Sequence, residues 1–253
     1  DFSNDIKMSG VNSINWARII AQSVYYFYSY CLVEDNKQTI NFSVPTGNFG
    51  DIYAGYLAKK MGLPINKLIV ATNQNDILHR AISMGSYEVE NVNETISPSM
   101  DIQIASNFER LIYDLNGKDD LKTINAMNDI KDKKKYLLDE EKLDQIKIDF
   151  ASSRMSENEI LETIKSVYEK FDLVLDPHSA IGYGAFDKVN IDGNNIVLAT
   201  AHPSKFPEAI KKSINLKSDL PKELRFVMDE KENYDIIENN IDKVKYHIKE
   251  RIQ

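Results

Sequence analysis

Two strand patterns, each followed by a helix pattern, place the strongest constraint on the fold. Residues 39–45 (TINFSVP) alternate as a half-buried β-strand does, and residues 66–72 (NKLIVAT) form an apolar run typical of a buried strand. A helical pattern follows each of them, one ending at Gly62 and the other at Gly85. The order strand, helix, strand, helix predicts a parallel sheet, because parallel neighbours need a crossover connection.

Similar patterns occur on both sides of this unit. Residues 12–33 are apolar at helical spacing and predict a largely buried helix, and SENE at 156–159 fits a capping box that opens another. An apolar strand is expected at 173–175, and residues 194–210 repeat the order strand, turn, helix. A last amphipathic helix is expected over about 233–250.

The order of these patterns divides the chain into three parts. Residues 1–85 are expected to form part of an α/β domain, and residues 171–253 its remaining strands and carboxyl-terminal helices. The stretch 86–170 is polar, rich in lysine and helical in pattern, so it is expected to be a mainly helical insertion. The fold class is therefore α/β, a parallel sheet flanked by helices with a helical insertion.

Composition narrows the classes of function. The chain has 253 residues, of which 42% are hydrophobic, and a net charge of -8, which disfavours nucleic acid or an anionic membrane as a partner. No run approaches the ~18 apolar residues of a membrane span and no signal core opens the chain, so a cytoplasmic location is expected. Cys31 is the single cysteine, and no cluster has metal-ligand spacing, so no metal site is expected. Because the chain opens on Asp1, we expect a fragment or a processed form.

The loop PTGNFGD (45–51) between the first strand and its helix is the sharpest local signal. Gly47 and Gly50 allow a tight turn in which consecutive N–H groups point into one concavity at the positive end of the helix. Such a concavity suits a phosphate dianion. The pattern is neither a phosphate-binding Walker loop nor the dinucleotide motif. From spacing alone, a tight strand-to-helix connection without a ligand is the favoured alternative.

Two further polar turns follow apolar strand patterns. In open parallel sheets, ligands bind beyond the carboxyl ends of the strands, so the polar residues of 198–206 are expected at the same edge as the glycine loop. These residues are Thr200, His202, Ser204 and Lys205. A capped turn that Pro203 ends is the alternative there. For the turn Asp176–Ser179, a simple helix cap is the alternative to a functional role.

Five sequence blocks resemble the threonine synthase family, particularly its fungal and bacterial long-chain branch. They occur in order, spanning most of 12–211: NSINWARIIAQSVYYF, VPTGNFGDIYAGYLAKKMGLP, ATNQNDILHRAI, DPHSAIGYGAF and TAHPSKFPEAI. The resemblance implies a tryptophan-synthase-β-like fold (fold type II) and pyridoxal 5'-phosphate (PLP) as cofactor. It also implies a lyase of threonine biosynthesis, which converts O-phosphohomoserine and water to threonine and phosphate.

The resemblance further implies roles for individual residues. The cofactor phosphate is expected in a cup lined by Gly47, Asn48, Phe49 and Gly50. Thr200 is expected to hydrogen-bond the pyridine nitrogen of PLP. Polar candidates for the substrate face are Asn12, Ser13, Asn15, His202, Ser204 and Lys205, of which Lys205 is suited to attract the substrate phosphate.

The chain departs from the family pattern at one place. The Schiff-base lysine of the family lies in a segment upstream of the position of Asn12, and no such block precedes Asn12 here. The lysines present, including Lys59, Lys60, Lys67 and Lys205, do not replace it. We therefore expect no catalytic lysine in this chain, no activity of the chain alone, and the missing amino-terminal segment of the same protein as a partner.

Two alternative functions fit the same residues. One is a truncated threonine-synthase-like protein with a non-catalytic binding role, and the other is a related phospho-lyase that acts on a different phosphorylated amino acid. Retention of the glycine loop favours enzyme ancestry but does not separate these alternatives.

Overall fold

The computed structural model describes residues 6, 10, 12–33 and 39–252. Residues 12–33 and 39–218 belong to one compact unit, and residues 219–252 belong to another. The second unit contains the 3-10 helix η3 (Lys222–Met228) and the helix α11 (Ile241–Ile252). Its last helix thus begins later than the sequence pattern predicts. All that follows concerns the larger unit.

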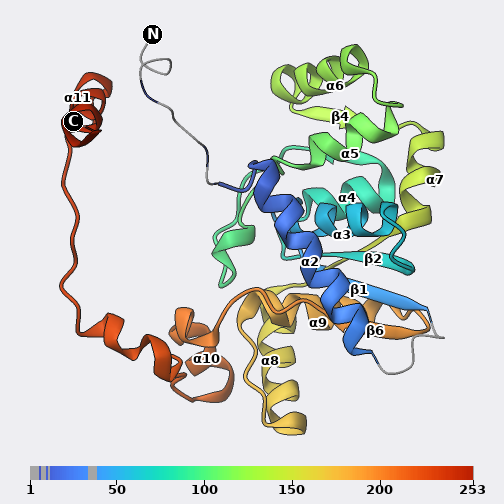
Figure 1. Cartoon of the computed structure of the whole chain (residues 1–253). Helices are drawn as coiled ribbons and strands as arrows, with labels where there is room; N and C mark the ends of the chain where they lie inside the picture. The colour runs from blue at the N-terminus through green and yellow to red at the C-terminus, as the bar shows by residue number, and fades with distance from the viewer. Residues whose placement is uncertain (1–5, 7–9, 11, 34–38, 253) are drawn as a thin grey trace. The chain divides into compact units, whose positions relative to one another are not determined.

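Four parallel strands form the central sheet of the larger unit (Figure 1). They are β1 (Ile40–Pro45), β2 (Ile65–Thr72), β5 (Phe150–Arg154) and β6 (Asn194–Val197), in the spatial order β5-β2-β1-β6. Val44 of β1 lies opposite Val70 of β2, and β1 also pairs with β6 along its other side. The predicted parallel α/β fold is confirmed.

Helices cover both faces of the sheet. Successive side chains of a strand point to opposite faces, so neighbouring residues of β1 contact different helices. On one face, Phe42 packs against Tyr26 of α2 (Trp16–Leu32), which lies against α3 (Gly50–Lys60). On the opposite face, the Ser43 hydroxyl donates to the backbone oxygen of Gly182 in α9 (Pro177–Val189). Behind α9 lie α8 (Glu157–Phe171) and α10 (Pro207–Ile214). Because the four strands are parallel, the loops that follow them collect at one edge of the sheet.

The predicted insertion contains strands as well as helices. After α4 (Ile77–Met84), the short strands β3 (Ser86–Glu88) and β4 (Lys135–Leu137) form an antiparallel pair. The helices of this stretch are η1 (Pro98–Met100), α5 (Phe108–Leu115), α6 (Asp120–Lys133), α7 (Glu140–Asp149) and α8. The same stretch also supplies β5, which pairs with β2 in the central sheet.

The structure corrects the prediction of a strand at 173–175. These residues have no regular secondary structure, and Leu173 is exposed while Val174 and Leu175 pack beside the helices of the second face. The edge position next to β2 belongs to β5, whose sequence FASSR lacks a clear apolar pattern. Small side chains suffice there because α9 packs closely over β5.

The prediction that residues 12–33 form a largely buried helix is wrong in its second part. The helix α2 is present, but only Ile19, Ser23 and Tyr26 are buried in it. Exposed apolar residues such as Val24 and Tyr28 occupy the side that faces away from the core. Two other details are confirmed: Ser156 and Glu159 form the capping box, and Gly85 ends α4 with φ of 74°.

Candidate functional site

The carboxyl ends of β1 and β6 meet where the direction of chain winding changes. The chain leaves β1 for α3 on one face of the sheet and reaches β6 from α9 on the other. Such a switch leaves a crevice between neighbouring loops, which is the usual ligand position in open α/β sheets. A cavity of about 590 Å³ lies at this point.

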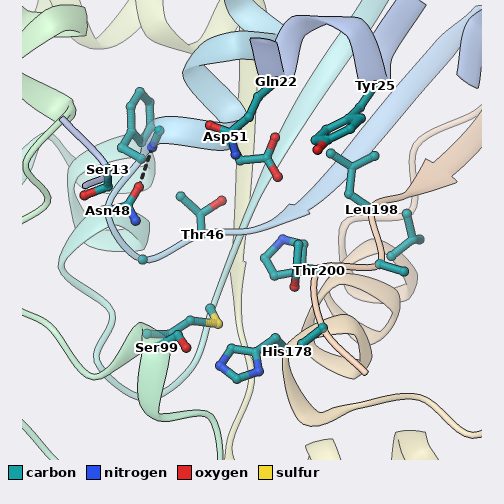
Figure 2. A pocket seen from close by; sticks show the side chains of 18 of the residues that line it. Ser13, Gln22, Tyr25, Thr46, Asn48, Asp51, Ser99, His178, Leu198 and Thr200 are labelled. Atoms are coloured by element: carbon teal, nitrogen blue, oxygen red, sulfur yellow. Dashed lines mark hydrogen bonds between the residues drawn. The ribbon is translucent and has the colours of Figure 1, made fainter. Parts of the chain in front are cut away.

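The cavity is lined by residues from distant parts of the chain. Figure 2 shows Thr46, Asp51, His178 and Thr200 around it, together with Ser13, Gln22 and Tyr25 at its edge. Its volume suits a small-molecule ligand. Its lining combines backbone of the glycine loop with charged side chains, namely Arg18, Asp51 and Lys205.

Hydrogen bonds hold the glycine loop in one conformation. The N–H of Thr46 donates to the oxygen of Ala71 at 2.8 Å, and the N–H of Asn107 donates to the oxygen of Asn48 at 3.0 Å. The side-chain oxygen of Asn48 accepts from the N–H of Gly50 at 2.8 Å. Among the described residues, the N–H groups of Gly47, Asn48 and Phe49 have no acceptor. These donors are available to an anion at the amino-terminal end of α3.

Backbone shape explains the residue types of this loop. A Cβ atom at position 47 would lie 2.9 Å from the oxygen of Ser99, and one at position 50 would lie 2.9 Å from the side-chain oxygen of Asn48. Phe49 has a positive φ of 68°, which is unfavourable for an L-residue. Its ring is buried and makes an edge contact with Phe108, so packing holds the backbone in this conformation.

The segment after β6 forms the opposite wall. The N–H of Leu198 donates to the oxygen of Ser43 at 3.0 Å, which continues the pairing of β6 with β1. Two residues later, the N–H of Thr200 donates to the hydroxyl of Ser179 at 3.2 Å. Thr200 is thereby fixed at the carboxyl end of the strand next to β1, facing the same cavity as the glycine loop (Figure 2).

One side of α2 supplies polar groups to the cavity. Its residues Arg18, Gln22, Tyr25 and Ser29 all line it. Their spacings of four, three and four place them on one stripe of an otherwise apolar helix. Sequence reasoning missed this stripe, although polar residues at helical spacing in an apolar helix are a detectable signal.

Asp51 places a partly buried carboxyl at the start of α3. Burial raises the pKa of its carboxyl to about 6, although the hydrogen bond from Tyr26 and the charge of Arg18 act in the opposite direction. Tyr26 is itself fully buried, and this burial, with the neighbouring Asp51 charge, raises the pKa of its hydroxyl. A carboxyl with such a pKa changes protonation near neutral pH, within reach of a ligand in the cavity.

The structure brings some of the predicted site residues together and separates others. The cavity is lined by Gly47, Asn48, Phe49, Gly50, Thr200, Ser13 and Lys205. Four predicted residues lie outside its lining, namely Asn12, Asn15, His202 and Ser204. Asn15 caps α2 by accepting from the N–H of Ala17 at 2.9 Å, and His202 and Ser204 hydrogen-bond each other at 2.7 Å. Arg18, Asp51 and His178 also line the cavity. The sequence prediction named none of them as site residues, although it considered the turn 176–179 and the loop 45–51.

Within residues 12–33 and 39–252, no group of three or more metal-ligating side chains is assembled to hold a metal ion. No helix in the described part of the chain is long and apolar enough to cross a membrane.

Comparisons with known proteins give a consistent family. Residues 179–248 match the family model "Threonine synthase, C-terminal". Threonine synthase of Pseudomonas aeruginosa is 42% identical over 246 residues, 96% of this chain and 52% of that protein. The Saccharomyces cerevisiae enzyme is also 42% identical, over 100% of this chain and 55% of its own length. The chain thus spans about half the length of these relatives.

A solved structure shares the fold closely. The crystal structure of PLP-bound threonine synthase from Brucella melitensis superposes with a TM-score of 0.94 at 44% sequence identity. The match covers 98% of this chain and 54% of that one.

Proposed function

Since this chain is homologous to the carboxyl-terminal portion of threonine synthases and shares their fold type II architecture, we propose that it forms the phosphate-binding side of a PLP-dependent threonine synthase. In this proposal the complete enzyme converts O-phosphohomoserine and water to threonine and phosphate, the final step of threonine biosynthesis. The main support for this proposal is that the glycine loop, Thr200 and Lys205 line one cavity although they are distant in sequence.

The residues of the cavity fit the cofactor. The three loop N–H groups without an acceptor, at Gly47, Asn48 and Phe49, supply donors for the PLP phosphate at the positive end of α3. The Thr200 hydroxyl supplies a neutral partner for the pyridine nitrogen. When bound, PLP supplies an electron sink for proton shifts at the substrate carbons.

Charged side chains that line the cavity suit an anionic substrate. Arg18 from α2 and Lys205 from the segment after β6 contribute positive charge, and Ser13 adds a hydroxyl. We propose that Arg18 and Lys205 bind the phosphate of O-phosphohomoserine, because charge-assisted hydrogen bonds to phosphate are strong and orient the leaving group. Asp51 lines the same cavity, where its carboxyl, with a pKa of about 6, holds or releases a proton near neutral pH.

The catalytic lysine is the part of the proposal that this chain does not supply. We propose that it lies in a segment upstream of this chain, as the length of the relatives allows. No lysine other than Lys205 lines the cavity among the described residues, and Lys205 is assigned to the substrate phosphate. A cytoplasmic location is part of the same proposal, and fractionation of cells would test it.

Reconstitution tests the proposed function. The 253-residue chain alone is expected to bind PLP weakly at most, to show no absorbance of a lysine-bound cofactor, and to form no threonine from O-phosphohomoserine. Adding the segment encoded upstream, fused or as a separate fragment, is expected to restore all three. Turnover by the chain alone, with borohydride trapping PLP on one of its own lysines, would disprove the placement of the lysine. A reconstituted protein that binds PLP but processes a different phosphorylated amino acid would identify a related phospho-lyase.

A further inference from the structure

His178 lies in the first turn of α9 and is held there by Asp176. Its Nδ1 lies 3.0 Å from Oδ1 of Asp176, and its backbone N–H donates to the same oxygen at 2.8 Å. The other carboxylate oxygen of Asp176 accepts from the hydroxyl of Ser179. All three residues are buried, so these hydrogen bonds determine the orientation of the imidazole ring.

These contacts decide which ring nitrogen carries the proton. Burial raises the pKa of Asp176, but the hydrogen bonds from His178 and Ser179 outweigh burial and hold this pKa below its ordinary value. An ionised carboxylate only accepts hydrogen bonds, so Nδ1 of His178 must be the donor. In the neutral imidazole the lone pair is then on Nε2.

The Nε2 atom is buried and lacks a hydrogen-bond partner in the described part of the chain. Buried polar atoms are nearly always paired, because an unpaired one loses its solvation without compensation. His178 lines the cavity, near Thr200 in Figure 2, and the ring of Phe206 packs at 4.9 Å against its imidazole. The molecule that binds in the cavity is therefore the candidate hydrogen-bond partner of Nε2.

We propose that His178 is a ligand-binding residue of this cavity, whose Nε2 accepts a hydrogen bond from a proton-donating group of the bound molecule. The inference rests on the proposed function for the identity of that molecule, which is PLP. It assigns to the turn Asp176–Ser179 a role beyond capping α9. The turn also fixes the neighbouring wall, because Ser179 accepts from the N–H of Thr200 while donating to Asp176.

The local charges fit an acceptor at this position. Asp176 is the charged group in direct contact with the His178 ring. The other charged side chains lining the cavity are Arg18, Asp51 and Lys205, from α2, α3 and the segment after β6. A hydroxyl is the class of group on the bound molecule from which Nε2 accepts.

Nitrogen NMR of the imidazole tests the assignment directly. The chain is labelled with ¹⁵N, combined with the upstream segment and titrated with PLP until the amides of Gly47 and Gly50 stop shifting. We expect the Nε2 resonance of His178 to shift in the direction of a hydrogen-bonded but unprotonated nitrogen, and the resonances of His79, in α4 and outside the cavity lining, to stay in place.

Three other results of this titration are possible. Saturated loop amides with an unmoved Nε2 would overturn the inference and leave the proposed function intact. A protonated Nε2 in the complex would overturn the acceptor assignment. Loop amides that never shift would refute PLP binding, and the inference would fail with the proposed function that supplies its ligand.

Two substitutions separate binding from a structural role. His178→Asn keeps a donor for Asp176 but removes the atom at the Nε2 position, whereas His178→Gln places an amide oxygen there. For the reconstituted protein we expect His178→Asn to weaken PLP binding about three- to tenfold, by fluorescence titration, with a nearly unchanged melting temperature. His178→Gln is expected within about twofold of the parent. His79→Asn, at a partly buried histidine of α4 outside the cavity lining, is the matched control. Equal losses for the Asn and Gln variants would show that the position is structural and overturn the inference.

Discussion

The hydroxyl of Tyr26 in α2 donates to the backbone oxygen of Asp51 in α3 at 2.8 Å and lies 3.3 Å from the Asp51 carboxylate. Because Tyr26 is fully buried, this contact ties the helix with the polar stripe to the first turn after the glycine loop. The hydrogen bond therefore connects the α2 side of the cavity to the glycine-loop side.

We predict that Tyr26→Phe lowers the free energy of unfolding by about 1–2 kcal/mol, because the buried acceptors on Asp51 lose their donor. Tyr28→Phe on the exposed side of the same helix is the control and should change little. Urea denaturation of the three proteins measures the difference. Equal stability of the parent and Tyr26→Phe would contradict the assigned role of this hydrogen bond.

The pKa of Asp51 predicts a pH-dependent stability. Its folded-state value of about 6 lies above the ordinary value of 3.8, so folding favours the protonated carboxyl. Its stabilising contribution is therefore complete below about pH 4 and is lost as pH rises through 6. We expect the unfolding free energy of the parent to fall relative to Asp51→Asn by about 1–3 kcal/mol between pH 4 and pH 7. A difference between the two proteins that does not vary with pH would show that the pKa is not raised.

Gly47→Ala tests the close approach at the glycine loop. The added Cβ would lie 2.9 Å from the oxygen of Ser99 and 3.2 Å from Cα of Met100, so the loop must shift. We expect a loss of about 1–3 kcal/mol of stability and at least about tenfold weaker PLP binding by the reconstituted protein. Gly117→Ala, which strains a left-handed residue outside the cavity lining, should lower stability without weakening PLP binding. Unchanged PLP affinity of Gly47→Ala would remove this loop from the phosphate site.

Lys205→Gln tests the assignment of the substrate phosphate. Removing the positive charge should raise the KM for O-phosphohomoserine roughly tenfold in the reconstituted enzyme, with a smaller effect on PLP affinity. Lys211→Gln on the exposed surface of α10 is the control and should leave KM unchanged. Steady-state phosphate release measures both variants. A KM that is the same for the parent and Lys205→Gln would refute the assigned contact.

The strand, glycine loop and helix at 39–62 are predictable from the sequence, because each element there depends on local chemistry. The apolar pattern of β1, the two glycines that tolerate close backbone contact and the apolar run of β2 are all visible without tertiary information. The capping box of Ser156 and Glu159 is predictable for the same reason, since its hydrogen bonds span only three residues.

Which strand lies next to β2, and which polar residues line the cavity, depends on tertiary packing. The strand β5 has no apolar pattern and owes its place to α9 packing over it, whereas the more apolar 173–175 stays irregular. Ser13 lines the cavity while Asn15, two residues later, caps a helix, and Lys205 lines it while its neighbour Ser204 pairs with His202. Local propensity does not predict these outcomes. They depend on how packing orients each side chain and on contacts with residues that are distant in sequence.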